Sequence, residues 1–206
     1  MNKRKFFKEY VEPIVIAVLI ALFVRTFIVQ AFKIPSSSME PTLLVGDYLL
    51  VNKFIYGTKI PFVDKKILEI RKPQRGDIVV FIYPKDRSKD FIKRVIGQEG
   101  EKVEIVQNKI YINDRLIEDP WGRFSEKPPW ARYLPSVERF GPVTVPKDSL
   151  FVLGDNRDNS QDSRYWGFVT LDEVKGKASI IYFSLNWNAG SLLDKVRWVR
   201  LGRLIR

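Results

Sequence analysis

A long apolar run near the N-terminus constrains this 206-residue chain more than any other feature. Residues 14–24 are all apolar, and after a short polar interruption apolar side chains again predominate as far as Phe32. A helix over residues 14–32 would be roughly 28 Å long, about the thickness of the hydrocarbon core of a bilayer. We therefore predict one transmembrane anchor over residues 13–32.

The charges around this anchor predict its orientation. Residues 1–12 form a basic tail, and positive charge beside a membrane span favours the cytoplasmic side. Residues 33–206 are then extracytoplasmic, in a single-pass protein of the cytoplasmic membrane. Arg25 would cost on the order of 3 kcal/mol at the bilayer centre, but its long side chain can reach the outer surface. The basic residues of the tail are Lys3, Arg4, Lys5 and Lys8.

A cleavable signal peptide is the alternative interpretation of the same segment. The apolar core of a signal peptide can be as short as this run, and residues 29–31 form a passable cleavage site. Apolar character continues to Phe32, beyond a normal signal-peptide core, and this favours a retained anchor.

Composition and charge narrow the class of protein. The chain is 45% hydrophobic and 13% aromatic, which is enough for a folded core. Its net charge of +11 suits either nucleic acid or an anionic membrane surface. The apolar N-terminus favours the membrane, so we expect membrane lipids and no nucleic acid as partners. The absence of cysteine excludes structural disulfides but leaves the compartment open.

Beyond the anchor, apolar and polar residues alternate with period two, and turn residues interrupt the pattern at short intervals. Only residues 171–175 suggest a short helical turn, and residues 119–146 are irregular. We therefore predict a mostly β fold, in which an antiparallel β-sheet core carries an inserted smaller lobe at about 104–146 and follows one N-terminal transmembrane helix. Strands are expected at residues 48–55, 78–83, 91–96, 103–106, 109–112, 143–145, 150–153 and 180–183.

Three consecutive serines, Ser36, Ser37 and Ser38, follow the anchor. The chain has no histidine and no cysteine, which excludes a His-based triad, a cysteine protease and a zinc site ligated by His or Cys. If one serine is a nucleophile, its base is another residue, and lysine is the obvious candidate. Taken alone, the three serines are more typical of a polar linker leaving the membrane.

Lys93 lies in the predicted strand at 91–96, where apolar residues occupy both faces. A lysine on such a face can be desolvated, and desolvation lowers its pKa. A general base needs this, since at the ordinary pKa of about 10.4 fewer than ~1% of lysines are neutral at pH 8. Neighbouring Arg94 cannot be the base because its guanidinium stays protonated. The alternative for Lys93 is an exposed strand lysine.

Residues 154–164, with the sequence G-D-N-R-D-N-S-Q-D-S-R, are rich in acidic and amide side chains. A calcium loop is one interpretation, but the order of the acidic residues is wrong, Arg157 adds positive charge, and Val169 occupies the position of the final glutamate. A packed loop with Asp–Arg pairs and Asx turns fits better, and we expect no metal and no cofactor. The residues expected to give structural support are Asp155, Arg157, Asp162 and Arg164.

Four segments together point to a known family: S-S-S-M-E-P-T at 36–42, R-G-D-I-V-V-F at 75–81, D-F-I-K-R-V-I-G at 90–97 and G-D-N-R-D-N-S-Q-D-S-R-Y-W-G at 154–167. They resemble the signature boxes of bacterial type I signal peptidase, the leader peptidase, and occur in that family's order. The resemblance implies a Ser/Lys serine endopeptidase that removes signal peptides from exported preproteins on the outer side of the membrane. The family often has glycine at the position of Ser37, and many members carry a second N-terminal transmembrane segment.

The resemblance also implies roles for single residues. Ser38, which precedes the methionine, matches the nucleophile, and Lys93 matches the general base. Ser36 matches the hydroxyl that helps the Ser38 backbone N–H stabilise the oxyanion. Ser160 matches the serine that orients the lysine amine. Asp162 and Arg164 match the two residues whose ion pair supports the site.

The position of Ser38 agrees with such a substrate. Ser38 follows Phe32 by six residues, at most roughly 20 Å of extended chain, so it stays near the outer membrane surface. A signal peptide emerges there, with small residues at its cleavage site. Met39 and Leu43 are expected to line shallow pockets for those residues. The C-terminal tail, with arginines between apolar residues, suits either an interfacial surface or a closing strand.

Two other functions fit parts of the sequence. A self-cleaving repressor-type protease would share the β core and the Ser/Lys dyad, but it would carry a DNA-binding helix-turn-helix domain where this chain has an anchor. A non-enzymatic, membrane-tethered β module that binds acidic ligands is supported only by the basic charge. Such a module would tolerate replacement of Ser38.

Overall fold

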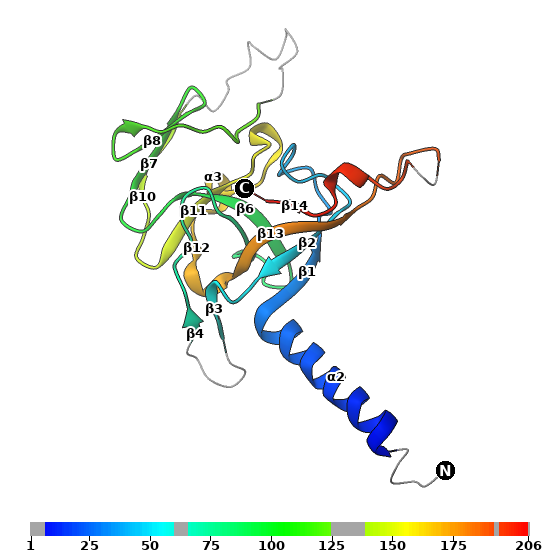
Figure 1. The fold of residues 1–206 in the computed structure, drawn as a ribbon. Helices are drawn as coiled ribbons and strands as arrows, with labels where there is room; N and C mark the ends of the chain where they lie inside the picture. Colours follow the sequence, from blue (N-terminus) through cyan, green and yellow to red (C-terminus); the bar gives the residue numbers. More distant parts are fainter. Residues whose placement is uncertain (1–6, 60–65, 125–138, 192–193, 206) are drawn as a thin grey trace.

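The computed structural model describes residues 7–59, 66–124, 139–191 and 194–205 (Figure 1). A helix projects away from a body made of β-strands, and the strands bring distant parts of the chain side by side. The basic residues at 3–5 and the middle of the expected lobe, 125–138, lie outside the described residues.

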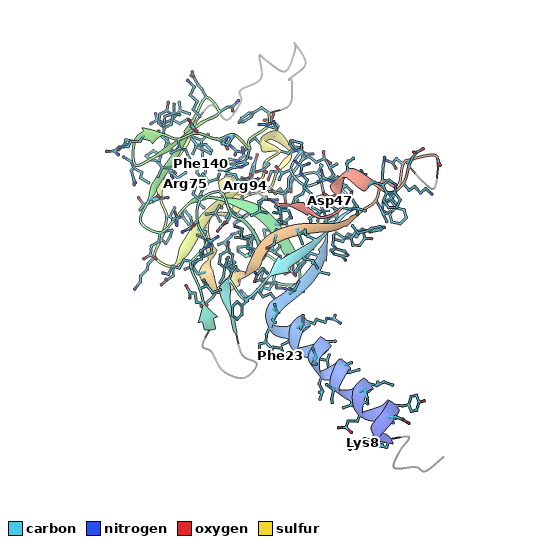
Figure 2. All side chains as sticks on the ribbon, viewed as in Figure 1. Lys8, Phe23, Asp47, Arg75, Arg94 and Phe140 are labelled. Carbon is cyan, nitrogen blue, oxygen red and sulfur yellow. The ribbon has the colours of Figure 1, made fainter. Side chains whose placement is uncertain are left out.

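The N-terminal segment forms one continuous helix, Phe7–Ile28, built from η1 (Phe7–Val11), α2 (Glu12–Phe23) and η2 (Val24–Ile28). Its 22 residues have a mean hydropathy of 2.3, and by length and composition it can cross a membrane. The α-helical rise gives a length of about 33 Å. Side chains of α2 such as Phe23 project outward and are exposed, and no residue of the apolar window is buried within the described part of the chain (Figure 2).

The predicted helix over residues 14–32 is wrong at its C-terminal end, because the helix stops at Ile28. Strand β1 (Val29–Lys33) follows at once and pairs antiparallel with β2 (Asp47–Asn52). The Lys53 backbone N–H donates to the Ile28 carbonyl at 2.9 Å, and Lys53 Nζ donates to the Thr26 carbonyl at 2.7 Å. These bonds satisfy carbonyls that a helix end leaves unpaired. Apolar composition could not show this boundary, since Val29, Ala31 and Phe32 of β1 continue the apolar pattern of the helix.

The main sheet has eight strands in the order β1-β2-β13-β5-β6-β11-β12, and β14 pairs with β13 off this path. All its pairings are antiparallel, so the predicted mostly β, antiparallel fold with one N-terminal helix is confirmed. The strands not yet bounded are β5 (Ile78–Ile82), β6 (Asp90–Gly97), β11 (Ser149–Leu153), β12 (Val169–Thr170), β13 (Val174–Ser184) and β14 (Arg203–Leu204).

A second sheet, with strand order β10-β7-β8-β9, is inserted between β6 and β11 in the sequence. The turn between β7 and β8 contains Gln107 and Asn108, both at positive φ, as tight hairpins require. A separate hairpin pairs β3 with β4. The bounds of these strands are β3 (Tyr56–Lys59), β4 (Lys66–Glu69), β7 (Lys102–Val106), β8 (Lys109–Ile112), β9 (Arg115–Leu116) and β10 (Arg139–Thr144).

Strand β13 is much longer than the predicted strand at 180–183. Its first half places small residues, Gly176 and Ala178, on the buried face, and these give no apolar signal. A Cβ at Gly176 would lie 2.5 Å from the Asn52 carbonyl oxygen of β2, so glycine allows the two strands to pair there. The short turn expected near residues 171–175 is present as η5 (Leu171–Glu173). The closing-strand interpretation of the C-terminal tail is confirmed for β14.

One hydrophobic cluster fixes the segment that follows β1 against the main sheet. Met39 and Leu43 are fully buried in it. The prediction that these two side chains line pockets for substrate is therefore wrong, because the sheet covers them. The cluster consists of Ile34, Met39, Leu43, Leu49, Ile78, Ala178, Ile181 and Ile205. Three short helices complete the described structure: η4 (Arg157–Asn159), α3 (Ser163–Trp166) and η6 (Trp198–Arg200).

Candidate active site

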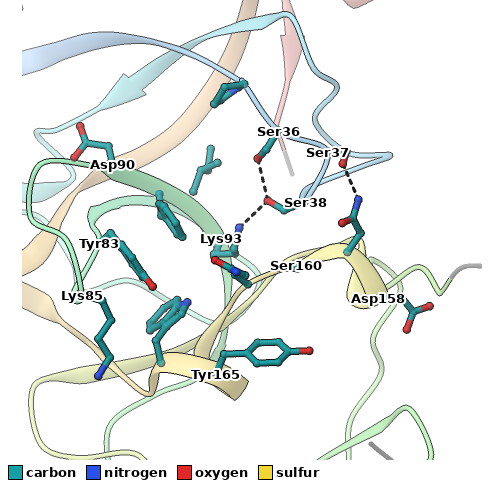
Figure 3. Close-up of a pocket in the computed structure, with 16 residues that line it drawn as sticks. Ser36, Ser37, Ser38, Tyr83, Lys85, Asp90, Lys93, Asp158, Ser160 and Tyr165 are labelled. Atoms are coloured by element: carbon teal, nitrogen blue, oxygen red, sulfur yellow. Dashed lines mark hydrogen bonds between the residues drawn. The ribbon is translucent and has the colours of Figure 1, made fainter. Parts of the chain in front are cut away.

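The fold brings Ser38 and Lys93 into direct contact, although they are 55 residues apart in the sequence (Figure 3). Ser38 lies in the turns after β1, and Lys93 lies in the middle of β6. Lys93 Nζ donates a hydrogen bond of 2.7 Å to Ser38 Oγ. Both residues are buried, with 8% of Ser38 and 3% of Lys93 exposed. The two residues predicted as nucleophile and base therefore form one hydrogen-bonded unit.

The surroundings of Lys93 change its acidity. Burial lowers its pKa from 10.5 to about 8, although the negative charges of Asp162 and Asp155 oppose this shift. The Phe91 ring centroid lies 5.5 Å from the amine and forms part of this apolar setting. Desolvation disfavours the charged form of an amine, so a substantial fraction of Lys93 is neutral slightly above neutral pH.

The other two serines of the triplet have different positions. Ser36 Oγ lies 3.5 Å from Ser38 Oγ, at the outer limit of a hydrogen bond, and faces the same pocket. The Ser37 hydroxyl instead accepts a hydrogen bond of 2.9 Å from Asn159 Nδ2, and Figure 3 shows it directed away from Lys93. Ser38 is thus the member of the triplet that reaches the lysine.

Ser160 lines the same pocket, but its hydroxyl has no hydrogen-bond partner within the described part of the chain. Ser160 therefore makes no hydrogen bond to the Lys93 amine, which the family resemblance implies that it orients. Ser160 packs against Gly154, where a Cβ would lie 2.1 Å from Ser160 Oγ and 2.5 Å from the Ser38 carbonyl oxygen. Glycine at this position lets the loop approach both serines.

Asp155, Arg157 and Asp162 of the loop at 154–164 are buried and paired, but not all of their partners lie within the loop. Asp162 accepts from Arg164 Nε at 2.8 Å, as predicted. Asp155 binds Arg94 through both carboxylate oxygens at 2.8 and 2.7 Å. Arg157 contacts Asp119, which lies in the irregular segment that follows β9. The loop is therefore tied to β6 as well as to itself.

Sequence reasoning missed Arg94 and Asp119 as partners. Arg94 is fully buried, whereas the sequence predicts only that it is not the base. Its position between Ile92 and Ile96 on one face of a strand was the available signal, since a buried guanidinium needs a carboxylate partner. No signal in the sequence identified Asp119, because its contact depends on how the irregular segment folds back.

A family model described as signal peptidase, peptidase S26, matches residues 7–183. The chain belongs to the signal peptidase family. It is 36% identical to signal peptidase I of Pseudomonas fluorescens and 38% identical to that of Pseudomonas aeruginosa, with 98% of this chain and 81% of each relative covered. It is 35% identical to signal peptidase I of Aquifex aeolicus, over 86% of this chain and 84% of the relative. A solved signal peptidase I from Enterococcus faecalis is 34% identical, with a TM-score of 0.42 over 53% of this chain and 98% of that chain.

Because the chain belongs to the signal peptidase family, it is a serine endopeptidase that removes signal peptides. Membership of this family excludes both alternatives, the self-cleaving repressor and the non-enzymatic binding module. The predicted family resemblance is confirmed.

The signal peptidase pocket has a volume of about 910 Å³ and opens beside the Ser38–Lys93 pair (Figure 3). One wall is aromatic: Tyr83 stacks on Phe91 with ring centroids 4.1 Å apart, and Trp166 packs edge-on against Tyr83. Ser36, Ser38, Lys93 and Ser160 also line the pocket. Among the described residues, no group of three or more acidic side chains is placed to hold a metal ion. The pocket is large enough for several residues of an extended peptide.

Proposed function

We propose that this signal peptidase cleaves preproteins with Ser38 as nucleophile and Lys93 as general base, without a metal or other cofactor. The 2.7 Å contact between Lys93 Nζ and Ser38 Oγ in a buried site carries this proposal. An activated hydroxyl needs a base within hydrogen-bond reach, and a lysine serves only if its amine is neutral. Burial supplies that condition by lowering the pKa of Lys93 to about 8.

The reaction follows from this geometry. Neutral Lys93 takes the proton of Ser38 as Oγ attacks the scissile carbonyl, and the ammonium then protonates the leaving amine of the mature protein. Lys93 next takes a proton from the water that attacks the acyl-enzyme, and it returns this proton to Ser38 Oγ as the ester bond breaks. The Ser36 hydroxyl and the Ser38 backbone N–H stabilise the oxyanion, because donors aimed at developing charge act strongly in a buried site. Ser160 limits the motion of the amine.

The buried ion pairs support this arrangement. Asp162 and Arg164 fix the loop that carries Ser160, and Arg164 also donates to the Arg157 carbonyl at 2.6 Å. Asn156, between Asp155 and Arg157, donates its backbone N–H to the Ser38 carbonyl at 3.1 Å. Loss of any of these charges leaves a buried partner without compensation, which is strongly destabilising.

The substrates are preproteins with small residues at the signal-peptide cleavage site, and the site faces the outer surface of the cytoplasmic membrane. The anchor helix passes directly into β1, and only the segment after Lys33 separates the sheet from Ser38. A basic N-terminus favours the cytoplasmic side and places residues 33–206 outside, next to membrane lipids. Signal peptides emerge at this surface with their cleavage site just beyond an apolar core.

Cleavage and topology are tested together in sealed, right-side-out vesicles. We expect added preprotein to be cleaved after its signal peptide, and external protease to digest residues 33–206 while the protected fragment retains the N-terminus of the chain. Vesicles of inverted orientation are the control and should cleave only after addition of detergent. Protection of the β body from external protease would contradict the proposed orientation.

The pH dependence should report Lys93. Because its pKa is lowered to about 8, kcat/KM should rise with pH and level off above a midpoint near that value.

The lowered pKa of Lys93 also has a consequence for stability. Between about pH 8 and pH 10.5, Lys93 is protonated in a larger fraction of unfolded chains than of native chains. The free energy of unfolding should therefore rise with pH across this window. Lys93→Met should remove the part of this rise that Lys93 contributes, and a kinetic midpoint near 10 would contradict the role.

Ser36→Ala and Ser160→Ala should each lower kcat. Removal of one oxyanion donor costs roughly 10²- to 10³-fold in kcat, and we expect Ser36→Ala in that range with KM little changed. Ser160→Ala should have a smaller effect, since the Ser160 hydroxyl makes no hydrogen bond within the described residues. Steady-state kinetics on one preprotein in detergent decide this. Ser88→Ala, in an exposed turn, is the control.

A further inference from the structure

The C-terminal segment contributes a buried arginine to the far side of the segment that carries Ser38. Arg200 lies in η6, beyond residue 183, where the match to the family model ends. Only 6% of it is exposed. Its Nε and Nη2 donate to the two carboxylate oxygens of Asp47 at 3.0 and 2.5 Å. Figure 2 shows Asp47 beside this C-terminal segment.

Asp47 is a junction of several contacts. It is fully buried and also accepts from the Ser184 hydroxyl at 2.6 Å and from the Leu44 backbone N–H at 2.8 Å. Asp47 begins β2, and Ser184 ends β13. A charged pair with this many satisfied bonds has a defined geometry, because guanidinium and carboxylate meet in a planar fork. Arg200 therefore adds a bidentate contact at the point where the segment that follows Ser38 enters the sheet.

The same guanidinium also contacts the middle of that segment. Arg200 Nη2 donates to the Thr42 carbonyl at 3.0 Å. The Thr42 hydroxyl donates to Asp155 at 2.6 Å, and Asp155 is paired with Arg94. Arg94 is the neighbour of Lys93 in β6. Thr42 thus bridges two buried Asp–Arg pairs, one from the C-terminal segment and one beside the base.

We propose that Arg200 is a positioning residue for the nucleophile: by binding Asp47 and the Thr42 carbonyl, it keeps Ser38 Oγ at hydrogen-bond distance from Lys93 Nζ. Arg200 does not line the pocket and does not act on substrate. A shift of the segment by 1 Å would lengthen the 2.7 Å contact beyond a hydrogen bond. The proposal rests on Ser38 and Lys93 being the catalytic pair.

The test compares Arg200→Met with Arg203→Met in the full chain in detergent micelles. Arg203 lies in the same C-terminal segment, but it is exposed. We expect Arg200→Met to lower kcat by about 10²-fold, as misplacement of reacting groups does, with KM unchanged. Arg203→Met should match the wild type. In Arg200→Ala, millimolar guanidinium should restore part of kcat, whereas it should not stimulate the wild type.

Several outcomes would overturn the proposal. Wild-type kcat in folded Arg200→Met would do so, and so would an equal loss of kcat in Arg203→Met. If Arg200→Met does not fold, Arg200→Lys decides, because lysine keeps the charge beside Asp47 but lacks the fork that bridges Asp47 and Thr42. An intermediate kcat is expected there, and a wild-type kcat overturns the role. Failure of the proposed function would give a different result, because Ser38→Ala would then still cleave the preprotein.

Discussion

Lys93→Arg should abolish cleavage while leaving the chain folded. Arginine keeps a positive charge near Asp155 and Asp162, the two carboxylates that act on Lys93, but its guanidinium does not release a proton near neutral pH. Loss of the proposed base should lower kcat by about 10⁴- to 10⁶-fold, as loss of the base does in other serine proteases. Turnover of a preprotein is measured together with the thermal unfolding temperature. Lys109→Arg, at an exposed strand position, is the matched control and should remain active.

The absence of cysteine from the chain allows a sharper version of this experiment. Lys93→Cys should be inactive, because a thiol lacks the reach and basicity of the amine. Alkylation with bromoethylamine then places an amine of nearly lysine length at this position alone. Partial return of activity is expected, with the pH profile moved to lower pH because a thioether lowers the pKa of the amine.

The controls separate the base from the rest of the site. Lys109→Cys treated in the same way should show unchanged activity before and after alkylation. An active Lys93→Arg enzyme would rule out the general-base role. Alkylated Lys93→Cys that stays inactive, although mass spectrometry shows complete modification, would also count against it.

Ser38→Ala should be the second variant without measurable turnover. Removal of a protease nucleophile costs about 10⁴- to 10⁶-fold in kcat, because no other group can form the acyl-enzyme. The adjacent serine provides the matched control. The Ser37 hydroxyl accepts from Asn159 and not from Lys93, so Ser37→Ala should keep activity close to that of the wild type.

The two serine variants are compared by kcat on the same preprotein and by thermal unfolding. Ser38→Ala should fold normally, since alanine fills the same buried position with a smaller group. Equal loss of activity in Ser37→Ala and Ser38→Ala would show that the nucleophile has been assigned to the wrong serine.

Several strands were predictable because their period-two pattern is local. Strands β5, β6, β7, β8 and β11 lie within one residue of their predicted bounds. The apolar N-terminal helix was predictable in existence but not in its end, because apolar residues continue from the helix into β1. The first half of β13 was missed, since small residues such as Gly176 and Ala178 bury backbone and not large side chains.

The candidate site was also predictable from the sequence only in part. The motifs identified Ser38 and Lys93, and the lack of histidine left lysine as the obvious base. The lowered pKa of Lys93 was expected from its semi-apolar strand, and burial in the folded chain is its cause. The sequence could not show that Ser37 faces Asn159, because that contact spans 122 residues.

By itself, the sequence determined what depends on neighbours in the chain: an apolar N-terminal helix, a set of alternating strands, and a chemistry without histidine or cysteine. The tertiary structure alone decided which residues meet across long separations. It pairs Asp155 with Arg94, binds Arg200 to Asp47 and Thr42, and buries Met39 and Leu43 beneath the sheet. The physical reason is that periodicity sets which face a side chain occupies, whereas strand order and register set what that face contacts.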